Sequence, residues 1–131
     1  MAECRIGVVG VGKMGEYHVG VLSDMREAEL VGIVDSDQKR AKIVSERYKT
    51  SNYKDYKELF KKVDAVVVAV PTSMHYSIGK EFIEAGIHTL LEKPCTDDLR
   101  QAEELFDIAA KKNVTLHIGH VERFNGAVQE L

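Results

Sequence analysis

The sequence predicts an α/β fold, a doubly wound parallel sheet of about six strands in the order 3-2-1-4-5-6 with helices on both faces. Short apolar segments alternate along the 131 residues with longer segments that repeat apolar residues at helical spacing. Residues 65–70, AVVVAV, are apolar at every position rather than at every second one. Such a run is typical of a strand that is buried on both faces of a parallel sheet.

The composition is that of a globular protein and excludes several functional classes. Hydrophobic residues make up 44% and charged residues 30%, and the net charge of −3 does not favour a nucleic-acid partner. Residues 65–70 form the longest apolar run, which is far too short to cross a membrane. Because the sequence leads directly into a strand, we expect no signal peptide. The 2 cysteines are too few for a disulfide framework, so we expect buried reduced thiols and a cytoplasmic location.

A glycine motif at residues 10–15, GVGKMG, lies between an apolar strand at 6–9 and a helical segment. Gly10 permits the tight turn, Gly12 lets a diphosphate approach the backbone, and Gly15 lets the helix pack against the strand. The free N–H groups of the helix N-terminus favour an anion there. We therefore predict a dinucleotide diphosphate at Gly10, Val11, Gly12, Lys13, Met14 and Gly15, with Met14, Val21 and Leu22 as the apolar positions of the helix.

Asp35 ends the second apolar segment, residues 28–34, and lies 20 residues after Gly15. A carboxylate at this distance accepts hydrogen bonds from the adenosine ribose in dinucleotide-binding folds. The same side chain could instead cap the following helix. Because Asp35 would repel a 2′-phosphate, we predict NAD as the cofactor, and Lys39 and Arg40 keep NADP possible.

The remaining elements follow in strict alternation. We expect a helix at 36–48 capped by Ser36, a short strand at 50–53, a short helix at 56–61 and the strand at 65–70, ended by Pro71. Thr72 or Ser73 is expected to cap the next helix, which ends at Gly86. Then come a strand at 87–91, a helix capped by Thr96, a strand at 114–118 and a helix that reaches residue 131. The helix after Thr96 has an inward stripe predicted at Leu99, Ala102, Leu105, Phe106 and Ala109.

The motifs at the strand ends resemble those of the glucose–fructose oxidoreductase and inositol dehydrogenase family of NAD(P)-dependent enzymes. The resemblance rests on GVGKMG with His18, on Asp35, on PTSMH at 71–75, on EKP at 92–94 and on GHVERFN at 119–125. The last stretch is most similar to members that act on nucleotide-linked amino sugars.

This resemblance implies roles for matching residues. Lys93 would be the catalytic residue beside the nicotinamide and the reacting carbinol, where a cation stabilises developing alkoxide charge. Further cofactor contacts are implied for Pro71, Thr72, His75, Glu92, Lys93, Pro94 and Arg123. The structural alternatives are a solvent-facing Lys93 or Lys13, a His75 that caps its helix, and an Arg123 that pairs with a carboxylate.

A metal site is not predicted. His117, His120 and Glu122 are close in sequence, but their spacing is not that of a helical zinc motif, and no further ligand cluster accompanies them.

The resemblance also implies a domain organisation. Residues 1–120 would form an NAD(P)-binding Rossmann domain, and residues 121–131 would begin the connection to a missing C-terminal substrate domain. The predicted function is the cofactor-binding part of an oxidoreductase acting on a sugar, polyol or nucleotide-sugar carbinol, without turnover by this chain alone. A homo-oligomer is expected for the full-length protein. The alternatives are a free-standing nucleotide-sensing module and, with less support, a methyltransferase.

Overall fold

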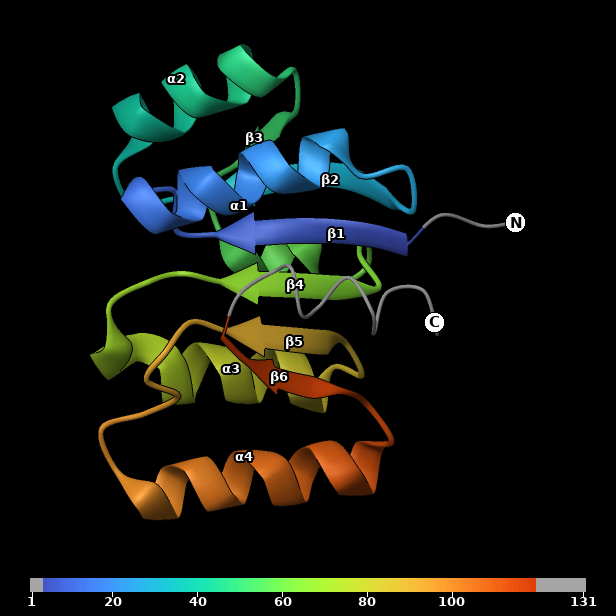
Figure 1. The fold of residues 1–131 in the computed structure, drawn as a ribbon, viewed down its shortest axis with the longest axis vertical. Coiled ribbons are helices and arrows are strands. Elements are labelled where there is room, and N and C mark those ends of the chain that lie inside the picture. Colours follow the sequence, from blue (N-terminus) through green and yellow to red (C-terminus); the bar gives the residue numbers. More distant parts are fainter. Residues whose placement is uncertain (1–3, 120–131) are drawn as a thin grey trace.

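A computed structural model describes residues 4–119 and confirms the predicted sheet. Six parallel strands lie in the order β3-β2-β1-β4-β5-β6 (Figure 1). The elements in chain order are β1 (Cys4–Val9), α1 (Lys13–Asp24), β2 (Ala28–Val34), α2 (Gln38–Tyr48), β3 (Ser51–Tyr53), the 3₁₀ helix η1 (Tyr56–Leu59), β4 (Ala65–Val68), the 3₁₀ helix η2 (Thr72–Met74), α3 (His75–Glu84), β5 (His88–Leu91), α4 (Leu99–Lys112) and β6 (Leu116–Ile118).

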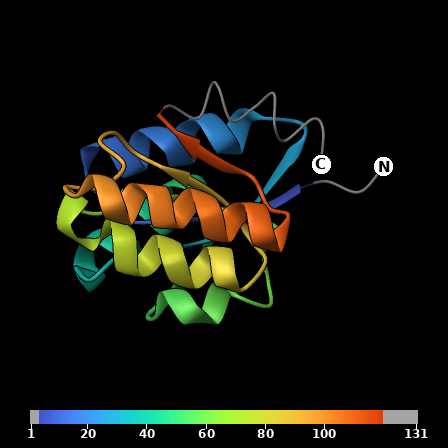
Figure 2. The same cartoon turned by 90° about the horizontal axis from the view of Figure 1, so that it is seen from below.

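Helices cover both faces of the sheet, and each face has its own apolar core. Ala65 and Val67 of β4 pack with residues of α1 and α2, whereas Val66 and Val68 pack with residues of η1, α3 and α4. Figure 2 shows α1 on one side of the sheet and α3 and α4 on the other. All four of these β4 residues are completely buried, which explains why the strand is apolar throughout.

The helix boundaries correct several predicted caps. Asp37, not Ser36, caps α2, and its side chain accepts hydrogen bonds from the backbone N–H groups of Lys39 and Arg40. Asp98, not Thr96, caps α4, because its carboxylate accepts the N–H of Arg100. Neither Thr72 nor Ser73 makes a side-chain cap, since the chain enters α3 through the turn η2. Gly86 does follow α3 with a positive φ of 81°, as predicted.

Two residues of the predicted stripe, Leu99 and Phe106, are exposed, and so is Met14, an apolar position of the first helix. Leu99 and Phe106 are 74% and 47% exposed because α4 is an outer helix that buries only the narrow stripe formed by Leu105 and Ala109. Met14 on α1 is 41% exposed, and the buried face of that helix is formed by other residues, Gly15, His18, Val19 and Leu22.

The two thiols differ in their surroundings. Cys4 is buried in the core beside α1 and α2, and burial, followed by the charge of Asp64, raises the pKa of its thiol to about 11. Cys95 is half-buried, so the expectation of buried thiols holds fully only for Cys4. Over residues 4–119, no helix is long and apolar enough to cross a membrane, and no group of three or more His, Cys, Asp or Glu side chains is placed to hold a metal ion.

Candidate functional site

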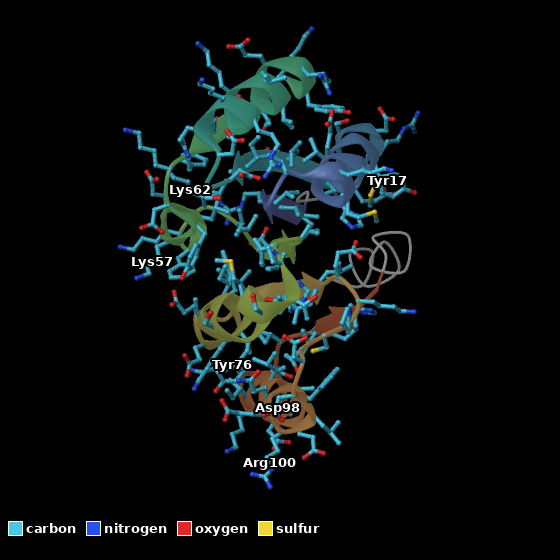
Figure 3. All side chains as sticks on the ribbon, turned by 90° about the vertical axis from the view of Figure 1, so that its left-hand side faces the viewer. Tyr17, Lys57, Lys62, Tyr76, Asp98 and Arg100 are labelled. Atoms are coloured by element: carbon cyan, nitrogen blue, oxygen red, sulfur yellow. The ribbon has the colours of Figure 1, made fainter. Side chains whose placement is uncertain are left out.

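A crevice opens at the carboxyl ends of β1 and β4, and the topology of the sheet produces it. The two strands are neighbours, but the helix after β1 packs on one face of the sheet and the helix after β4 on the other. The chain therefore leaves the sheet in opposite directions at this point, which is where ligands bind in doubly wound folds. Figure 3 faces this edge, with Tyr17 of α1 and Lys57 of η1 on opposite sides.

A cavity of about 640 Å³ occupies the crevice. Its walls come from the ends of β1 and β2, from the turns after β1, β2, β3 and β4, and from α2, η1, η2 and α3. The lining residues are Val9, Gly10, Gly12, Val34, Asp35, Ser36, Arg40, Lys54, Asp55, Tyr56, Ala69, Val70, Pro71, Met74 and Ile78. A volume of this size is typical of small-molecule and cofactor sites.

Two of the three motif glycines are required by the fold itself. Gly10 has a φ of +93°, and a Cβ there would lie 2.7 Å from the carbonyl oxygen of Ala69. A Cβ on Gly15 would lie 1.8 Å from the carbonyl oxygen of Gly10, so only a glycine lets α1 begin this close to the turn. These are the turn and packing roles that the sequence predicts for the two residues.

Gly12 is different, because no contact within residues 4–119 requires it to be a glycine. Its φ of −67° is accessible to any residue, and a Cβ would meet no atom closer than Arg40 Nη1, at 3.8 Å. Gly12 is also the N-cap of α1 and makes no side-chain cap. A side chain at Gly12 would therefore fill space at the N-terminus of α1, where the N–H groups of the first turn have no partner within the helix.

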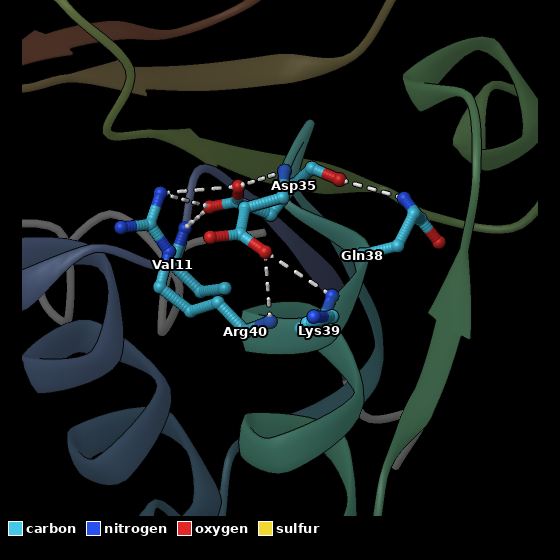
Figure 4. A network of polar contacts seen from close by, with 6 residues as sticks. Val11, Asp35, Gln38, Lys39 and Arg40 are labelled. Carbon is cyan, nitrogen blue, oxygen red and sulfur yellow. Dashed lines mark hydrogen bonds and ion pairs between the residues drawn. The ribbon is translucent and has the colours of Figure 1, made fainter.

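Asp35 lies at the end of β2, with a side chain that is 3% exposed (Figure 4). Its Oδ2 accepts the backbone N–H of Val11 and its Oδ1 that of Asp37, both at 2.7 Å. Arg40 Nη2 lies 3.1 Å from each oxygen. Burial acts to raise the pKa of Asp35, but the hydrogen bonds from Val11, Asp37 and Arg40 outweigh it and lower the pKa below its usual value. Asp35 is therefore a fixed carboxylate at neutral pH.

His75 is completely enclosed behind the tip of β4. Its Nε2 lies 2.9 Å from the carbonyl oxygen of Val70, and its Nδ1 lies 3.0 Å from those of Pro94 and Cys95. The ring thus joins the loop after β4 to the loop after β5, and it does not act as a helix cap. Both of its ring nitrogens are engaged within the protein and link these two loops.

The EKP segment lies beside α1 at the same edge of the sheet. Glu92 contacts Nε2 of the completely buried His18 through its carboxylate. Nδ1 of His18 has no hydrogen-bond partner in the described part of the chain, which favours the tautomer with its proton on Nε2. Lys93 is exposed, and the bond that joins it to Pro94 is cis. Thus α1 supports the segment that carries the predicted catalytic lysine.

The structure brings part of the predicted site together. Gly10, Gly12, Asp35 and Pro71 line one cavity. Lys13 and Met14 are exposed on the first turn of α1 and Thr72 is half-buried in η2, all three outside the lining. Arg123, His120 and Glu122 lie outside the described residues.

Sequence reasoning missed one wall of the cavity and one supporting contact. Lys54, Asp55 and Tyr56 follow β3, and Met74 and Ile78 come from the segment after β4. Lys54, Asp55 and Tyr56 could have been predicted from their position directly after a strand, because the carboxyl ends of all parallel strands lie at the same edge of the sheet. The contact of His18 with Glu92 joins residues 74 positions apart, and no local pattern predicts it.

The fold and this crevice define a dinucleotide-binding α/β domain, with a bare turn at a helix N-terminus and a fixed carboxylate at the end of the second strand. The chain belongs to the oxidoreductase family with an NAD-binding Rossmann fold, whose family profile matches residues 4–120. This confirms the predicted fold, family and class of cofactor.

Known proteins agree with this assignment. UDP-N-acetylglucosamine 3-dehydrogenase of Acidithiobacillus ferrooxidans is 34% identical over 131 residues, which are 100% of this chain and 41% of that protein. The structure of GenD2 from gentamicin A biosynthesis, in complex with NAD, has a TM-score of 0.88 at 30% identity, over 91% of this chain and 35% of that one. KijD10, a 3-ketoreductase from Actinomadura kijaniata in complex with NADP, has a TM-score of 0.84 at 31% identity, over 89% and 38%. The chain therefore spans less than half the length of these relatives.

Proposed function

We propose that this chain is the cofactor-binding part of an NAD(P)-dependent oxidoreductase that acts on a carbinol of a sugar, polyol or nucleotide sugar. The observation that carries the proposal is Gly12: no neighbour among the described residues requires a glycine there, and the missing side chain leaves the helix N-terminus open to a diphosphate. The nicotinamide cofactor supplies or accepts the hydride. This chain holds the diphosphate at the turn and the adenosine ribose near Asp35.

The substrate class is supported by the relatives. One relative is named a UDP-N-acetylglucosamine 3-dehydrogenase, and the 3-ketoreductase structure is also known in complex with TDP-benzene. In the proposed enzyme, Lys93 stabilises the charge that develops on the carbinol oxygen. Glu92, which is held by His18, positions Lys93. Thr72, Pro94 and Arg123 are proposed to complete the cofactor contacts, and His75 to support them through the loops that it joins.

The proposed organisation follows the same reasoning. Residues 1–120 form the cofactor domain, and residues 121–131 begin the connection to a substrate domain that completes the active site and forms the contacts of a homo-oligomer. We further propose a cytoplasmic location, which suits reduced thiols. The fixed negative charge of Asp35 favours NAD over NADP.

Cofactor binding tests the proposal directly. We expect the 131-residue chain to bind NADH in isothermal titration calorimetry and to show no turnover by itself. Gly12→Val should remain folded, because the backbone and the space allow a side chain, with a loss of about 1 kcal/mol for valine at an N-cap, but it should abolish NADH binding. Gly20→Ala is the matched control on the same helix, since its Cβ would make ordinary contact with Tyr48 Oη at 3.5 Å. Absence of NADH binding by the wild type at millimolar cofactor, or wild-type binding by Gly12→Val, would contradict the proposal.

A further inference from the structure

The segment between β5 and α4 has little structure of its own to hold it in place. Residues 92–98 form neither a helix nor a strand. Among the described residues, the backbone of 92–97 makes one hydrogen bond to other backbone, from the Glu92 N–H to the Val68 carbonyl at 3.3 Å. The side chain of Cys95 packs against the core beneath α3 and α4. The position of the EKP segment, residues 92–94, therefore depends on side chains from other elements.

Two buried histidines supply these side chains, one from each face of the sheet. His18 of α1 contacts the carboxylate of Glu92 through Nε2. His75, the first residue of α3, places Nδ1 3.0 Å from the carbonyl oxygens of Pro94 and Cys95. The helices α1 and α3 cover opposite faces of the sheet (Figure 2). The segment is thus anchored from both faces, on either side of the exposed Lys93.

The two rings use different nitrogens for these contacts. His18 has no partner at Nδ1 among the described residues, so its proton lies on Nε2 and is donated to Glu92. His75 has two carbonyl oxygens at Nδ1, and carbonyl oxygens can only accept, so the contact with this segment needs a proton on Nδ1. The anchoring atom is therefore Nε2 in one histidine and Nδ1 in the other.

The strand order indicates which half of the cofactor this segment meets. The proposed function places the diphosphate at the turn after β1 and the adenosine ribose at the end of β2. In the sheet, β2 lies on one side of β1, whereas β4 and β5 lie on the other. A dinucleotide that crosses at the turn therefore extends its second nucleoside over the ends of β4 and β5. Loops that are fixed before binding bind a ligand more tightly, because less entropy is lost on association.

We propose that His18 and His75 are paired positioning residues that fix the EKP segment for the nicotinamide half of the cofactor. This inference rests on the proposed function and adds the two residues that organise the second half of its binding site. Both rings are buried, so they act through Glu92, Pro94 and Cys95. Loss of either anchoring hydrogen bond loosens the segment. It weakens binding of the whole dinucleotide and leaves binding of its adenosine diphosphate half unchanged.

The test compares dissociation constants for NADH and ADP, measured by calorimetry on the 131-residue chain and its variants. A glutamine amide nitrogen reaches about as far as histidine Nε2, and an asparagine amide nitrogen about as far as Nδ1, and both are donors. His18→Gln and His75→Asn should keep the Kd for NADH within about threefold of wild type. His18→Asn and His75→Gln should raise it about tenfold, as expected for one lost buried hydrogen bond. All four should leave the Kd for ADP within about twofold.

His88→Gln is the matched control. His88 begins β5 at the opposite edge of the sheet from the EKP segment, and its Nδ1 accepts the backbone N–H of Thr115 at 2.9 Å. This variant should change neither constant by more than about twofold. A thermal melt of each variant shows whether it is folded.

The outcomes separate this inference from the proposed function. If asparagine and glutamine have equal effects at each position, or if NADH and ADP weaken in proportion, the histidines are only structural and the inference is wrong. A wild type that binds ADP as tightly as NADH also overturns the inference, whether or not the variants fold, and leaves the proposed diphosphate site standing. A wild type that binds neither ligand contradicts the proposed function, and the inference fails with it.

Discussion

Replacing Gly15 by alanine tests whether the close start of α1 determines the geometry of the turn. The new Cβ would lie 1.8 Å from the carbonyl oxygen of Gly10, whereas Cβ atoms essentially never come closer than 3.0 Å to such a neighbour. The turn or the helix must therefore move by more than 1 Å. The turn has little freedom to move, because the N–H of Gly10 is bound to the Val34 carbonyl at 2.7 Å and its Cα faces the carbonyl of Ala69.

Gly15→Ala has two opposing effects on the free energy of unfolding, a loss from overpacking and a gain from helix propensity. Overpacking costs about 1–3 kcal/mol and more where the backbone must shift. Alanine in place of glycine in a helix returns up to about 1 kcal/mol. The net loss for Gly15→Ala is therefore about 2 kcal/mol. For a chain of this size, that lowers the melting temperature by roughly 6–10 °C.

Thermal unfolding followed by circular dichroism measures this shift, with Gly20→Ala as the control. Both glycines lie in α1, and a Cβ on Gly20 would be in ordinary contact with Tyr48, at 3.5 Å or more. The control should gain helix propensity and melt about 3 °C above the wild type. The reasoning is refuted if Gly15→Ala is as stable as the wild type, or if the two variants shift together.

Two further predictions concern polar contacts elsewhere at the sheet edges. His75→Leu keeps the volume but leaves three carbonyl groups without their buried partner, so urea unfolding should show a loss of about 2–4 kcal/mol. A loss below about 1 kcal/mol would show that the ring does not join the two loops. Burial raises the pKa of Asp64, but the hydrogen bonds from the backbone and side chain of Arg5 lower it further, to below the usual 3.8. Its contribution to stability is therefore complete above about pH 5 and is lost as the pH falls through the lowered pKa. The deficit of Asp64→Asn, at most about 1 kcal/mol for this exposed pair, should be present at pH 7 and vanish in acid, and a deficit independent of pH would contradict the assignment.

The sheet and the turn could be predicted because each depends on local chemistry. The apolar run at 65–70 indicates a strand buried on both faces, and the alternation of strands and helices indicates a parallel sheet. The glycine motif indicates a dinucleotide-binding fold, and the strand order 3-2-1-4-5-6 is the one typical of that fold. Cap assignment failed at Ser36 and Asp37 because two good capping residues are adjacent, and only the geometry of the chain decides between them. The inward stripe of α4 was predicted too wide because periodicity does not show that a helix lies in an outer layer.

The site was only partly predictable for a different reason. Asp35 and the motif are recognised by their spacing, but the Arg40 contact depends on a side-chain conformation within the cavity. The contact of Glu92 with His18 depends on the packing of α1 against the far half of the sheet. Sequence periodicity contains neither kind of information.

The cavity lining runs only from Val9 to Ile78, whereas the EKP segment comes after β5. The nucleotide pocket and the lysine beside the proposed reaction centre are thus encoded by separate stretches of the chain, which meet at one sheet edge. Substitutions that alter the later stretch can leave the residues lining the cavity unchanged, provided that the contacts of His18 and His75 with it are kept. This separation suits a family whose members, to judge by their names, are dehydrogenases of different compounds.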